Sequence, residues 1–488
     1  MPFKPIILWT DALVFLLIAV VIASGWYIRR QEHLKAPWRK VARSRYGMCS
    51  LVTLSVFVVI GFLDSLHYRP RLDARQADGK ANYAVEVRSV FDVLVDPLGK
   101  LPEKTYSAPF AAYAFAKETI SRPDGSQARE FPRLRFGGAH LEDPETQLVP
   151  DVLRGMLGAV GLAAVFWIVL TMLLAAWLAG IRNSDFGRML SAIIHGDSEV
   201  PWRAMLLTAG LLLAVAVPLA LLSTRYHVMG TDKVGQDVFY QALKSIRTGL
   251  VIGTLTTLVM LPFAILLGIM AGYFRGWVDD VIQYIYTTLN SIPGVLLIVA
   301  SVLIIQVLMD RHQDMFETVS ERADVRLLAL CLILGITSWT GLCRLLRGEA
   351  LKLRELEYVQ AAHAFGVSDW RIITRHLLPN VMHIVLITVV MEFSGLVLAE
   401  AVLSYVGVGV DPSMISFGTM INNARLELAR DPMVWWSLAA AFVFMFLLVL
   451  AANLFADSVR DAFDPRVRSG LTTRLRRSPR LALKTKEA

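Results

Sequence analysis

The sequence predicts an all-α polytopic membrane protein with about nine transmembrane helices. Its 488 residues are 55% hydrophobic and only 18% charged, and the mean hydropathy is +0.52. A soluble chain of this length needs more polar surface. Nine apolar runs are long enough for a helix to cross a bilayer, which takes roughly 20 residues. They lie near residues 8–28, 48–66, 155–180, 204–223, 246–273, 283–309, 327–346, 382–404 and 434–456.

The first apolar run is predicted to remain in the protein as a membrane span. It is long for a secretory signal peptide, and a single lysine precedes it. The residues "IASGWYIRR" follow it where a signal peptide has a small-residue cleavage site.

The distribution of Lys and Arg predicts the orientation. The loop 29–47 has seven Lys/Arg and one acid, and the tail from Arg466 has eight Lys/Arg and one acid. Cytoplasmic segments of membrane proteins carry such an excess. Eight spans separate the two segments, so both are expected on one side, with the N-terminus outside and the C-terminus inside. The basic tail 467–488 is expected along anionic lipid head groups.

The N-terminal part of the chain holds three of the spans. Residues 1–66 carry two of them, joined by the basic loop 29–47, and residues 155–180 form the third. Between them lies a predicted external insert, 67–154, with 13 basic and 13 acidic residues. Because "ANYAVEVRSVFDVLVDP" alternates partly like a strand, we expect a small α+β domain. A partly ordered loop is the alternative.

The segment 357–380, "EYVQAAHAFGVSDWRIITRHLLPN", is polar and helix-forming although it lies between two apolar spans. Gly366 suits a helix C-terminus. Ser368 can cap a following helix that has Asp369 in its first turn. Pro379 is expected to end that helix and redirect the chain into the membrane. The pattern predicts a cytoplasmic helix, a bend and a short helix. It is either a surface connector or a rigid platform for a partner.

This segment resembles the EAA signature of the membrane subunits of binding-protein-dependent ABC importers. More narrowly, it resembles the dipeptide/oligopeptide/nickel permease family. Gln360 stands where the signature has glutamate, so a carboxylate is not strictly needed there. Further blocks resemble the family in order, namely "HVMGTDKVGQDVF", with Gln236 in place of arginine, "AGYFRGWVDD", "LAEAVLSYVGVGV" and "FADSVRDAFDPR". The resemblance covers about 200–466 and leaves residues 1–180 unexplained.

The resemblance implies the fold of a type I ABC importer transmembrane domain with six core helices over 200–466. It implies a C-type permease subunit in the bacterial inner membrane, with a coupling loop at 349–380. The implied coupling residues are Glu357, Tyr358, Gln360, Ala361, Ala362, Gly366, Ser368, Asp369, Arg371, Leu378 and Pro379.

The resemblance also implies the partners. They are a second homologous permease, two ABC ATPase subunits that use ATP and Mg²⁺, and a periplasmic or lipid-anchored substrate-binding protein. The substrate class is di- or oligopeptides, with nickel as the alternative. The sequence has no Gly-x-x-x-x-Gly-Lys-Ser/Thr motif of its own. We therefore expect no enzyme activity and no cofactor bound by this chain.

Individual charged residues allow further expectations. Glu392 lies near the middle of a span, where a carboxylate costs roughly 2.5–3.5 kcal/mol unless it faces protein or water. Together with Glu400 it is a candidate for an acidic translocation path, and hydrogen bonding to neighbouring helices is the alternative. His227, Asp232 and Asp237 are expected at the external mouth, either as helix caps or as contacts for a binding protein.

Several other functions are disfavoured by the sequence. The histidines and cysteines are scattered without the spacing of a metal site. The net charge of +8 comes mostly from residues beside the spans, so nucleic-acid binding is not expected. An independent carrier would need ion-coupling groups of its own, for which Glu392 is the clear candidate. A membrane anchor whose insert is the working part is the third hypothesis.

Overall fold

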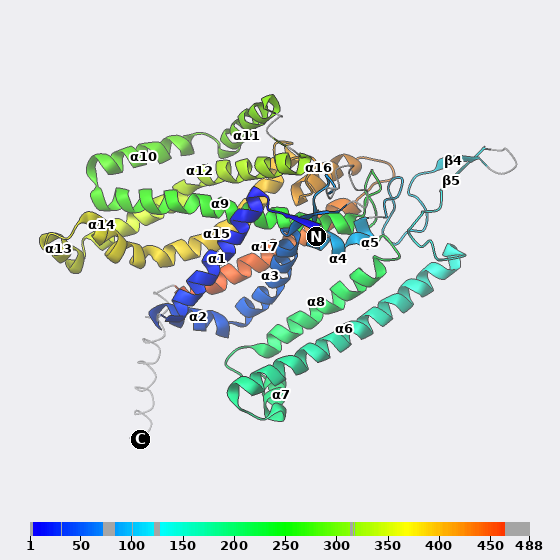
Figure 1. Ribbon diagram of the computed structural model, residues 1–488, viewed down its shortest axis with the longest axis horizontal. Coiled ribbons are helices and arrows are strands. Elements are labelled where there is room, and N and C mark those ends of the chain that lie inside the picture. Colours follow the sequence, from blue (N-terminus) through cyan, green and yellow to red (C-terminus); the bar gives the residue numbers. More distant parts are fainter. Residues whose placement is uncertain are drawn as a thin grey trace, which may run out of the picture.

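The computed structural model describes most of the chain, and helices dominate it (Figure 1). Within this part, nine helices are long and apolar enough to cross a membrane, which confirms the predicted number. The predicted basic tail 467–488 lies outside the described residues. These are residues 3–30, 32–71, 83–99, 101–121, 127–312, 316 and 318–463.

The membrane part contains the nine candidate spans and α10, a shorter helix that is not one of them. Their bounds are α1 Trp9–Arg30, α3 Arg45–Asp64, α6 Pro144–Arg182, α8 Trp202–Leu222, α9 Val238–Phe274, α10 Gly276–Ser291, α11 Gly294–Arg311, α12 Val319–Arg354, α15 Leu378–Tyr405 and α17 Trp436–Phe463.

Short helices and strands connect the spans. The short helices are α2 Glu32–Arg43, α4 Val90–Leu94, α5 Asp96–Gly99, α7 Phe186–His195, α13 Glu357–Ala364, α14 Asp369–Ile372 and α16 Phe417–Glu427. The strands are β1 Phe3–Ile6, β2 His67–Pro70, β3 Arg88–Ser89, β4 Glu118–Ser121 and β5 Gln127–Glu130.

The expected continuous span 283–309 is wrong, because α10 ends at Ser291 and α11 begins at Gly294. Proline has no backbone N–H, and it disfavours helical geometry in the residue before it. Accordingly, Ile292, which precedes Pro293, is extended with ψ 131°. A run of apolar residues cannot distinguish one helix from two that meet at such a break.

The centre of the membrane part is the pair α9 and α12, the most buried of the nine candidate spans. Glycine allows the two backbones to approach closely. A Cβ at Gly268 would lie 2.8 Å from the carbonyl oxygen of Cys343, and one at Gly272 would lie 2.6 Å from that of Arg347. Small residues let membrane helices pack in this way. The two cysteines of α12, Cys331 and Cys343, are buried and free, as small apolar residues.

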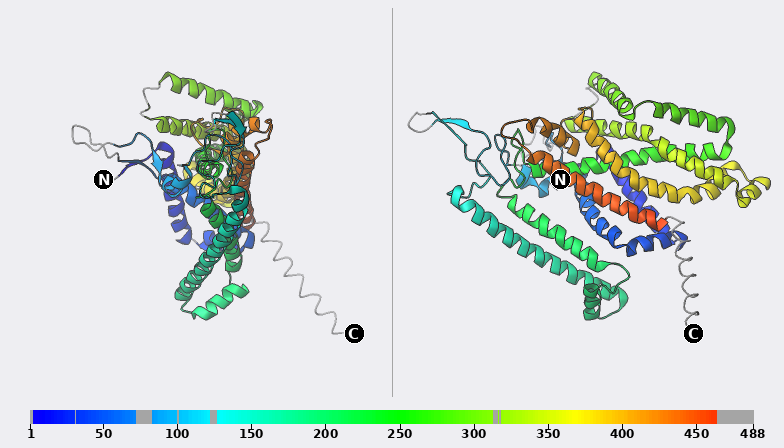
Figure 2. Two further views of the ribbon diagram at one scale, coloured as in Figure 1. Left: turned by 90° about the vertical axis from the view of Figure 1, so that its right-hand side faces the viewer. Right: turned by 180° about the vertical axis from the view of Figure 1, so that it is seen from behind.

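Helices α6 and α8 form a separate hairpin that leans away from the other spans (Figures 1 and 2). The Trp167 indole N–H donates to the carbonyl of Leu206 at 2.6 Å and lies over Gly210. Helix α6 begins at Pro144 with Asp143 as its N-cap, so it is longer than the predicted span 155–180. Its first turns occupy residues that the sequence assigned to the insert.

The insert contains both short helices and strands, and it joins the N-terminus of the chain. Strand β1 pairs antiparallel with β2, with Phe3 opposite Pro70 and Ile6 opposite His67. β2 pairs in turn with β3. The hairpin of β4 and β5 projects from the molecule at the end opposite α13 (Figure 1). We refer below to the insert end and to the loop end, where α13 and α14 lie.

Candidate functional site

The segment between α12 and α15 forms a compact projection at the loop end (Figure 1). Helix α13 ends at Ala364 with Phe365 as its C-cap, and Gly366 follows in the left-handed region with φ +74°. The glycine N–H donates to the carbonyl of His363 at 3.0 Å. A glycine at this position satisfies helix C-terminal carbonyls without strain on a Cβ. The predicted bend is therefore present at Gly366.

The short second helix differs from the sequence expectation at both ends. Ser368 has extended N-cap geometry, but its side chain makes no cap hydrogen bond. Pro379 was expected to end the helix, and this is wrong. A π-helical turn, Ile373–Leu377, joins α14 directly to α15, where Pro379 lies in the first turn. Pro379 lacks a backbone N–H, and it lies where the hydrogen-bond pattern changes from π-helical to α-helical.

The projection has an apolar side that anchors it and an exposed side that carries aromatic residues. Val359, Ile372 and Leu377 are buried in one cluster with residues of α9 and α12. Phe365 is 87% exposed and Trp370 is 64% exposed. Large exposed aromatic side chains on a rigid base are typical of binding surfaces. Neither Phe365 nor Trp370 was among the predicted coupling residues. The predicted ones are also exposed, except that Ala362 and Leu378 are half-buried.

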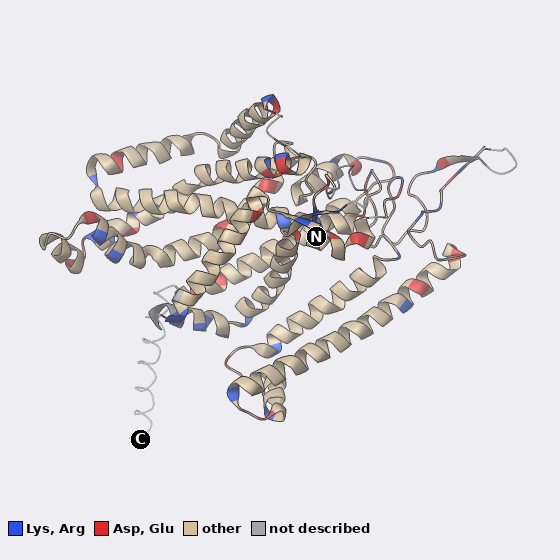
Figure 3. Ribbon diagram, in the orientation of Figure 1, with Lys and Arg blue, Asp and Glu red and all other residues tan. Residues whose placement is uncertain are grey.

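A polar pocket of about 550 Å³ lies between this projection and the end of α9. The Tyr273 hydroxyl donates to Asp369 at 2.6 Å, and Arg354 donates to the Tyr273 carbonyl at 2.6 Å. The amide of Gln360 lies 3.4 Å from a carboxylate oxygen of Glu355. A glutamate at this position would face another carboxylate, so the amide suits this environment. Figure 3 shows the charges gathered at this end of α13 and α14.

The three residues predicted at the external mouth lie at the insert end. Asp237 caps α9 by accepting from the Tyr240 N–H at 3.1 Å, and it also lies 2.8 Å from His227 Nδ1. Asp232 accepts from the backbone N–H groups of Val234 and Gln236 at 2.9 Å. Because His227 and Asp237 are buried, this geometry favours the capping role over contact with a partner.

The structure adds Glu103 of the insert to this cluster. Its carboxylate accepts from the backbone N–H groups of Arg135, Phe136 and Gly137, and lies 3.5 Å from His227 Nε2. Burial disfavours the Glu103 carboxylate, but His227 and these N–H groups outweigh it and lower the pKa to about 2. No sequence signal separates Glu103 from the other acids of the insert.

His227 is held as a cation by the same arrangement. Burial opposes its charge, yet the carboxylates of Asp237 and Glu103 raise the pKa of His227 to about 9. The insert is therefore joined to the segment before α9 by a buried ionic cluster.

A second buried ionic cluster joins α9 to the N-terminal helices. Arg247 donates to Asp11 of α1 at 2.7 Å, and Lys244 lies 2.6 Å from Asp64 of α3 and 2.8 Å from Asp92 of α4. Arg247 falls inside the predicted span 246–273, and a cation in a span requires a partner. That signal identifies Arg247 as important, but it does not reveal that Asp11 is its partner.

Glu392 and Glu400 lie on α15 in different environments. Glu400 is fully buried and accepts hydrogen bonds from Ser404 at 2.7 Å and Ser416 at 2.8 Å. This placement favours the structural alternative for Glu400. Glu392 is half-buried and forms no ion pair or hydrogen bond with other described residues.

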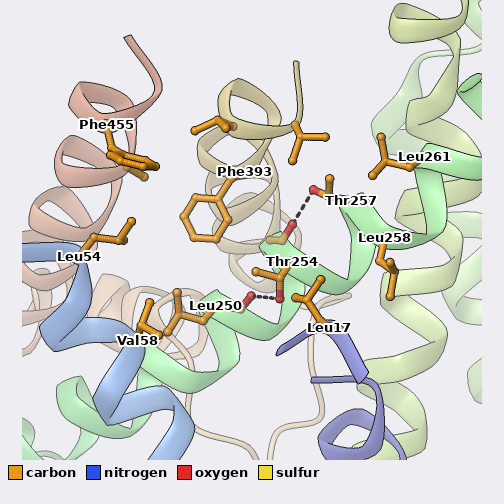
Figure 4. A pocket seen from close by; sticks show the side chains of 14 residues that line it. Leu17, Leu54, Val58, Leu250, Thr254, Thr257, Leu258, Leu261, Phe393 and Phe455 are labelled. Atoms are coloured by element: carbon orange, nitrogen blue, oxygen red, sulfur yellow. Dashed lines mark hydrogen bonds between the residues drawn. The ribbon is translucent and has the colours of Figure 1, made fainter. Parts of the chain in front are cut away.

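An apolar pocket of about 270 Å³ lies beside this part of α15. Figure 4 shows Phe393 of α15 extending into it beside Leu250 of α9. Thr254 and Thr257 donate to carbonyls of their own helix, as the dashed lines show, so the pocket offers little polarity (Figure 4). Glu392 does not line it.

Comparison with known proteins defines the family. The family model described as "Binding-protein-dependent transport system inner membrane component" matches residues 264–469. The glutathione transport system permease protein GsiD of Pectobacterium atrosepticum is 34% identical over 50% of this chain and 74% of its own length. The chain belongs to this family.

Two further members show the same extent of similarity. The oligopeptide transport system permease protein OppC of Mycobacterium tuberculosis is 32% identical over 50% of this chain and 77% of its own. The dipeptide transport system permease protein DppC of Bacillus subtilis is 29% identical over 50% and 69%. Among solved structures, the MetNI methionine ABC transporter aligns over 45% of this chain and 93% of its own, with 18% identity and a TM-score of 0.33.

As a member of this family of ABC importer permeases, the chain is a multi-pass protein of the bacterial inner membrane. The part matched by the family model begins within α9 and includes the projection with α13 and α14. The three N-terminal spans and the insert precede the match.

Proposed function

We propose that this permease imports di- or oligopeptides, with residues 200–466 as the transport unit. The insert end faces outward and the loop end faces the cytoplasm, as the distribution of Lys and Arg predicts. The names of the relatives support a peptide substrate, because they are permeases for glutathione, oligopeptides and dipeptides. A reconstituted transporter should accumulate labelled di- and tripeptides in an ATP-dependent manner. Uptake of radioactive nickel without peptide uptake would contradict the proposal.

The importer works as an assembly. A second permease completes the translocation path, two ATPase subunits bind ATP and Mg²⁺, and a binding protein delivers the substrate. This chain performs no bond chemistry. Its role is to convert movement of the ATPases into a change of access between the two membrane sides.

The projection at the loop end is the proposed ATPase-coupling element. The observation that carries this is its two-sided construction, with Val359 and Leu377 buried against α9 and α12 while Phe365 and Trp370 are exposed. Force applied to the exposed side passes to the spans because the buried side is fixed. Ala361 and Gln360 lie on the exposed surface with them.

Coupling can be tested with alanine variants of the exposed aromatic residues. Phe365→Ala together with Trp370→Ala should remove most peptide uptake and most transport-stimulated ATP hydrolysis. Phe186→Ala is a matched control, because Phe186 is an exposed aromatic of α7 outside the projection. If the double variant transports like the control, the projection does not couple ATP hydrolysis to uptake.

Glu392 is the proposed acidic position of the translocation path. It lies in a span without a partner among the described residues, so it is expected to face water or the second permease. Glu392→Gln should reduce uptake of peptides with a free amino group by about tenfold, which corresponds to about 1.4 kcal/mol. N-acetylated peptides should be much less affected. Unchanged uptake of every peptide would remove Glu392 from the path.

A further inference from the structure

A pocket of about 530 Å³ lies at the insert end, where the insert meets the segment before α9 and the end of α16. The insert supplies one wall, with Tyr106 and Phe115. The opposite wall comes from the permease core, with Lys233 before α9 and with Glu427, Arg430 and Asp431 at and after the end of α16. Its volume lies within the range of ligand sites in proteins, ≈ 300–1,000 Å³.

The insert wall is held rigidly against the core. The Glu103 N–H donates to the carbonyl of Gly235 at 2.9 Å, and the Thr231 N–H donates to that of Ser107 at 3.1 Å. The Thr231 hydroxyl donates to the carbonyl of Thr105 at 2.9 Å. Residues 103–107 thus lie alongside residues 231–235, and these hydrogen bonds hold Tyr106 in position. A pocket wall with this many backbone bonds is preformed.

Aromatic contacts support the wall from behind. Phe115 packs edge-on against Trp436 with ring centroids 4.9 Å apart. The Trp436 indole donates to the carbonyl of Thr231 at 2.9 Å. The apolar face of the pocket is therefore built on the first turn of α17.

The polar groups of the pocket are incompletely satisfied. Tyr106 is 6% exposed, and its hydroxyl lies beside Glu427 and Arg430 without a close hydrogen bond to either. Burial raises the pKa of Tyr106, and the nearby Glu427 carboxylate raises it further, so the phenol stays a neutral donor. A buried hydroxyl without a partner is unfavourable. A ligand that accepts from it would remove this penalty.

The charges of the pocket leave one cation and one anion unpaired. Glu427 and Arg430 form an ion pair at 3.1 Å, and the Arg430 guanidinium lies 5.1 Å from the centre of the Tyr106 ring. Lys233 and Asp431 are exposed and form no ion pair with other described residues. A ligand with both an anionic and a cationic group would complement them.

We propose that this pocket is an external binding site for a short zwitterionic peptide, built jointly by the insert and the permease core. Lys233 receives the free carboxylate, Asp431 receives the ammonium group, and an apolar side chain packs on Phe115. The peptide identity of the ligand rests on the proposed function, whereas the zwitterion follows from the unpaired charges. This gives the insert a role in transport.

Binding of a labelled tripeptide to the permease complex, without its binding protein, tests the site. Equilibrium dialysis of the complex in nanodiscs should detect saturable binding that Lys233→Met weakens about tenfold. A C-terminally amidated tripeptide should bind the parent complex as weakly as the free tripeptide binds the variant. Lys4→Met is the matched control, because Lys4 is an exposed lysine of β1 outside the pocket.

Three outcomes would overturn the proposal. One is no saturable peptide binding, and another is equal binding by the Lys233→Met and Lys4→Met complexes. The third is a Lys233→Met variant with weaker affinity for the binding protein and unchanged affinity for peptide, which would assign the pocket to the binding protein. In all three cases ATP-driven peptide uptake by the parent transporter would leave the proposed function intact. Absence of that uptake would contradict the function itself.

Discussion

Charged residues within the spans of this protein are stabilised in different ways. Arg247 is buried and bonded to Asp11 and Ser65, whereas Glu392 has no partner among the described residues. A buried charge with a partner holds helices together, and a half-exposed charge without one requires water or another chain. A charged residue within a span therefore stabilises helix packing in α9. In α15 it is the basis of a functional proposal.

The Arg247 pair leads to a prediction about stability. Asp11→Ala leaves the guanidinium without its main partner in a buried position. The variant should lose about 3–5 kcal/mol of folding free energy, which is typical when one partner of a buried ion pair is removed. Thermal unfolding of the purified protein in detergent would measure the loss. Asp11→Ala combined with Arg247→Met should recover part of it, and an equally unstable double variant would contradict the explanation.

His227 predicts a dependence of stability on pH. Its pKa is about 9 in the folded protein against about 6.5 when unfolded. The folded state therefore binds a proton more tightly, and its contribution is full below pH 6.5. It declines as the pH rises from 6.5 and is lost above about 9. A series of unfolding temperatures from pH 6 to 10 should show this decline, and His227→Gln should flatten it. An identical slope in the variant would disprove the role of His227.

In the projection at the loop end, one feature depends on local sequence and another on packing. The glycine bend at Gly366 follows from local chemistry, since left-handed geometry favours glycine. The continuous helix from α14 into α15 does not follow from local chemistry. A proline in the first turn of a helix and a proline just after a helix end look the same in the sequence. The π-helical turn Ile373–Leu377 decides between the two.

Two glycines with nearly equal backbone geometry provide a matched comparison. Gly235 has φ +76° and Gly366 has φ +74°, so alanine at either should cost about 1–2 kcal/mol from left-handed strain. A Cβ at Gly235 would also collide with the backbone carbonyl of Glu103, while a Cβ at Gly366 meets open space. Gly235→Ala should therefore destabilise the insert by at least 1 kcal/mol more. Limited proteolysis of the insert would report this, and equal cleavage rates in the two variants would refute it.

At the scale of the whole molecule, the N-terminal spans are part of the permease structure. Lys244 and Arg247 of α9 take their carboxylate partners from α1, α3 and α4. The first segment of the chain also contributes β1 to the sheet of the insert. The family model matches from residue 264 onward, so all of these interface residues precede the matched part.

Removal of residues 1–182 should therefore prevent stable assembly of the remaining spans. The truncated chain would expose the Lys244 and Arg247 cations at the surface of α9 without partners. We expect its yield as a monodisperse protein, measured by size-exclusion chromatography, to fall at least tenfold. Lys244→Met with Arg247→Met in the truncated chain should restore part of the yield. A truncated chain as abundant as the full one would show that the core is independent of the N-terminal spans.

The sequence by itself determined the class of protein, the number of spans and the bend at Gly366. These features depend on local properties, since about 20 apolar residues span a bilayer and one glycine permits a left-handed turn. The resemblance of ordered blocks over 200–466 also identified the family.

Only the tertiary structure decided which charges meet. Asp11 and Arg247 are 236 residues apart. Glu103 and His227 are separated in sequence by β4, β5, α6, α7 and α8. The energy of an electrostatic contact depends on the distance between the two charges in space. The residues next to an acid in the sequence do not indicate which distant residue it contacts. The pocket at the insert end has the same origin, because its two walls come from segments that are far apart in the sequence.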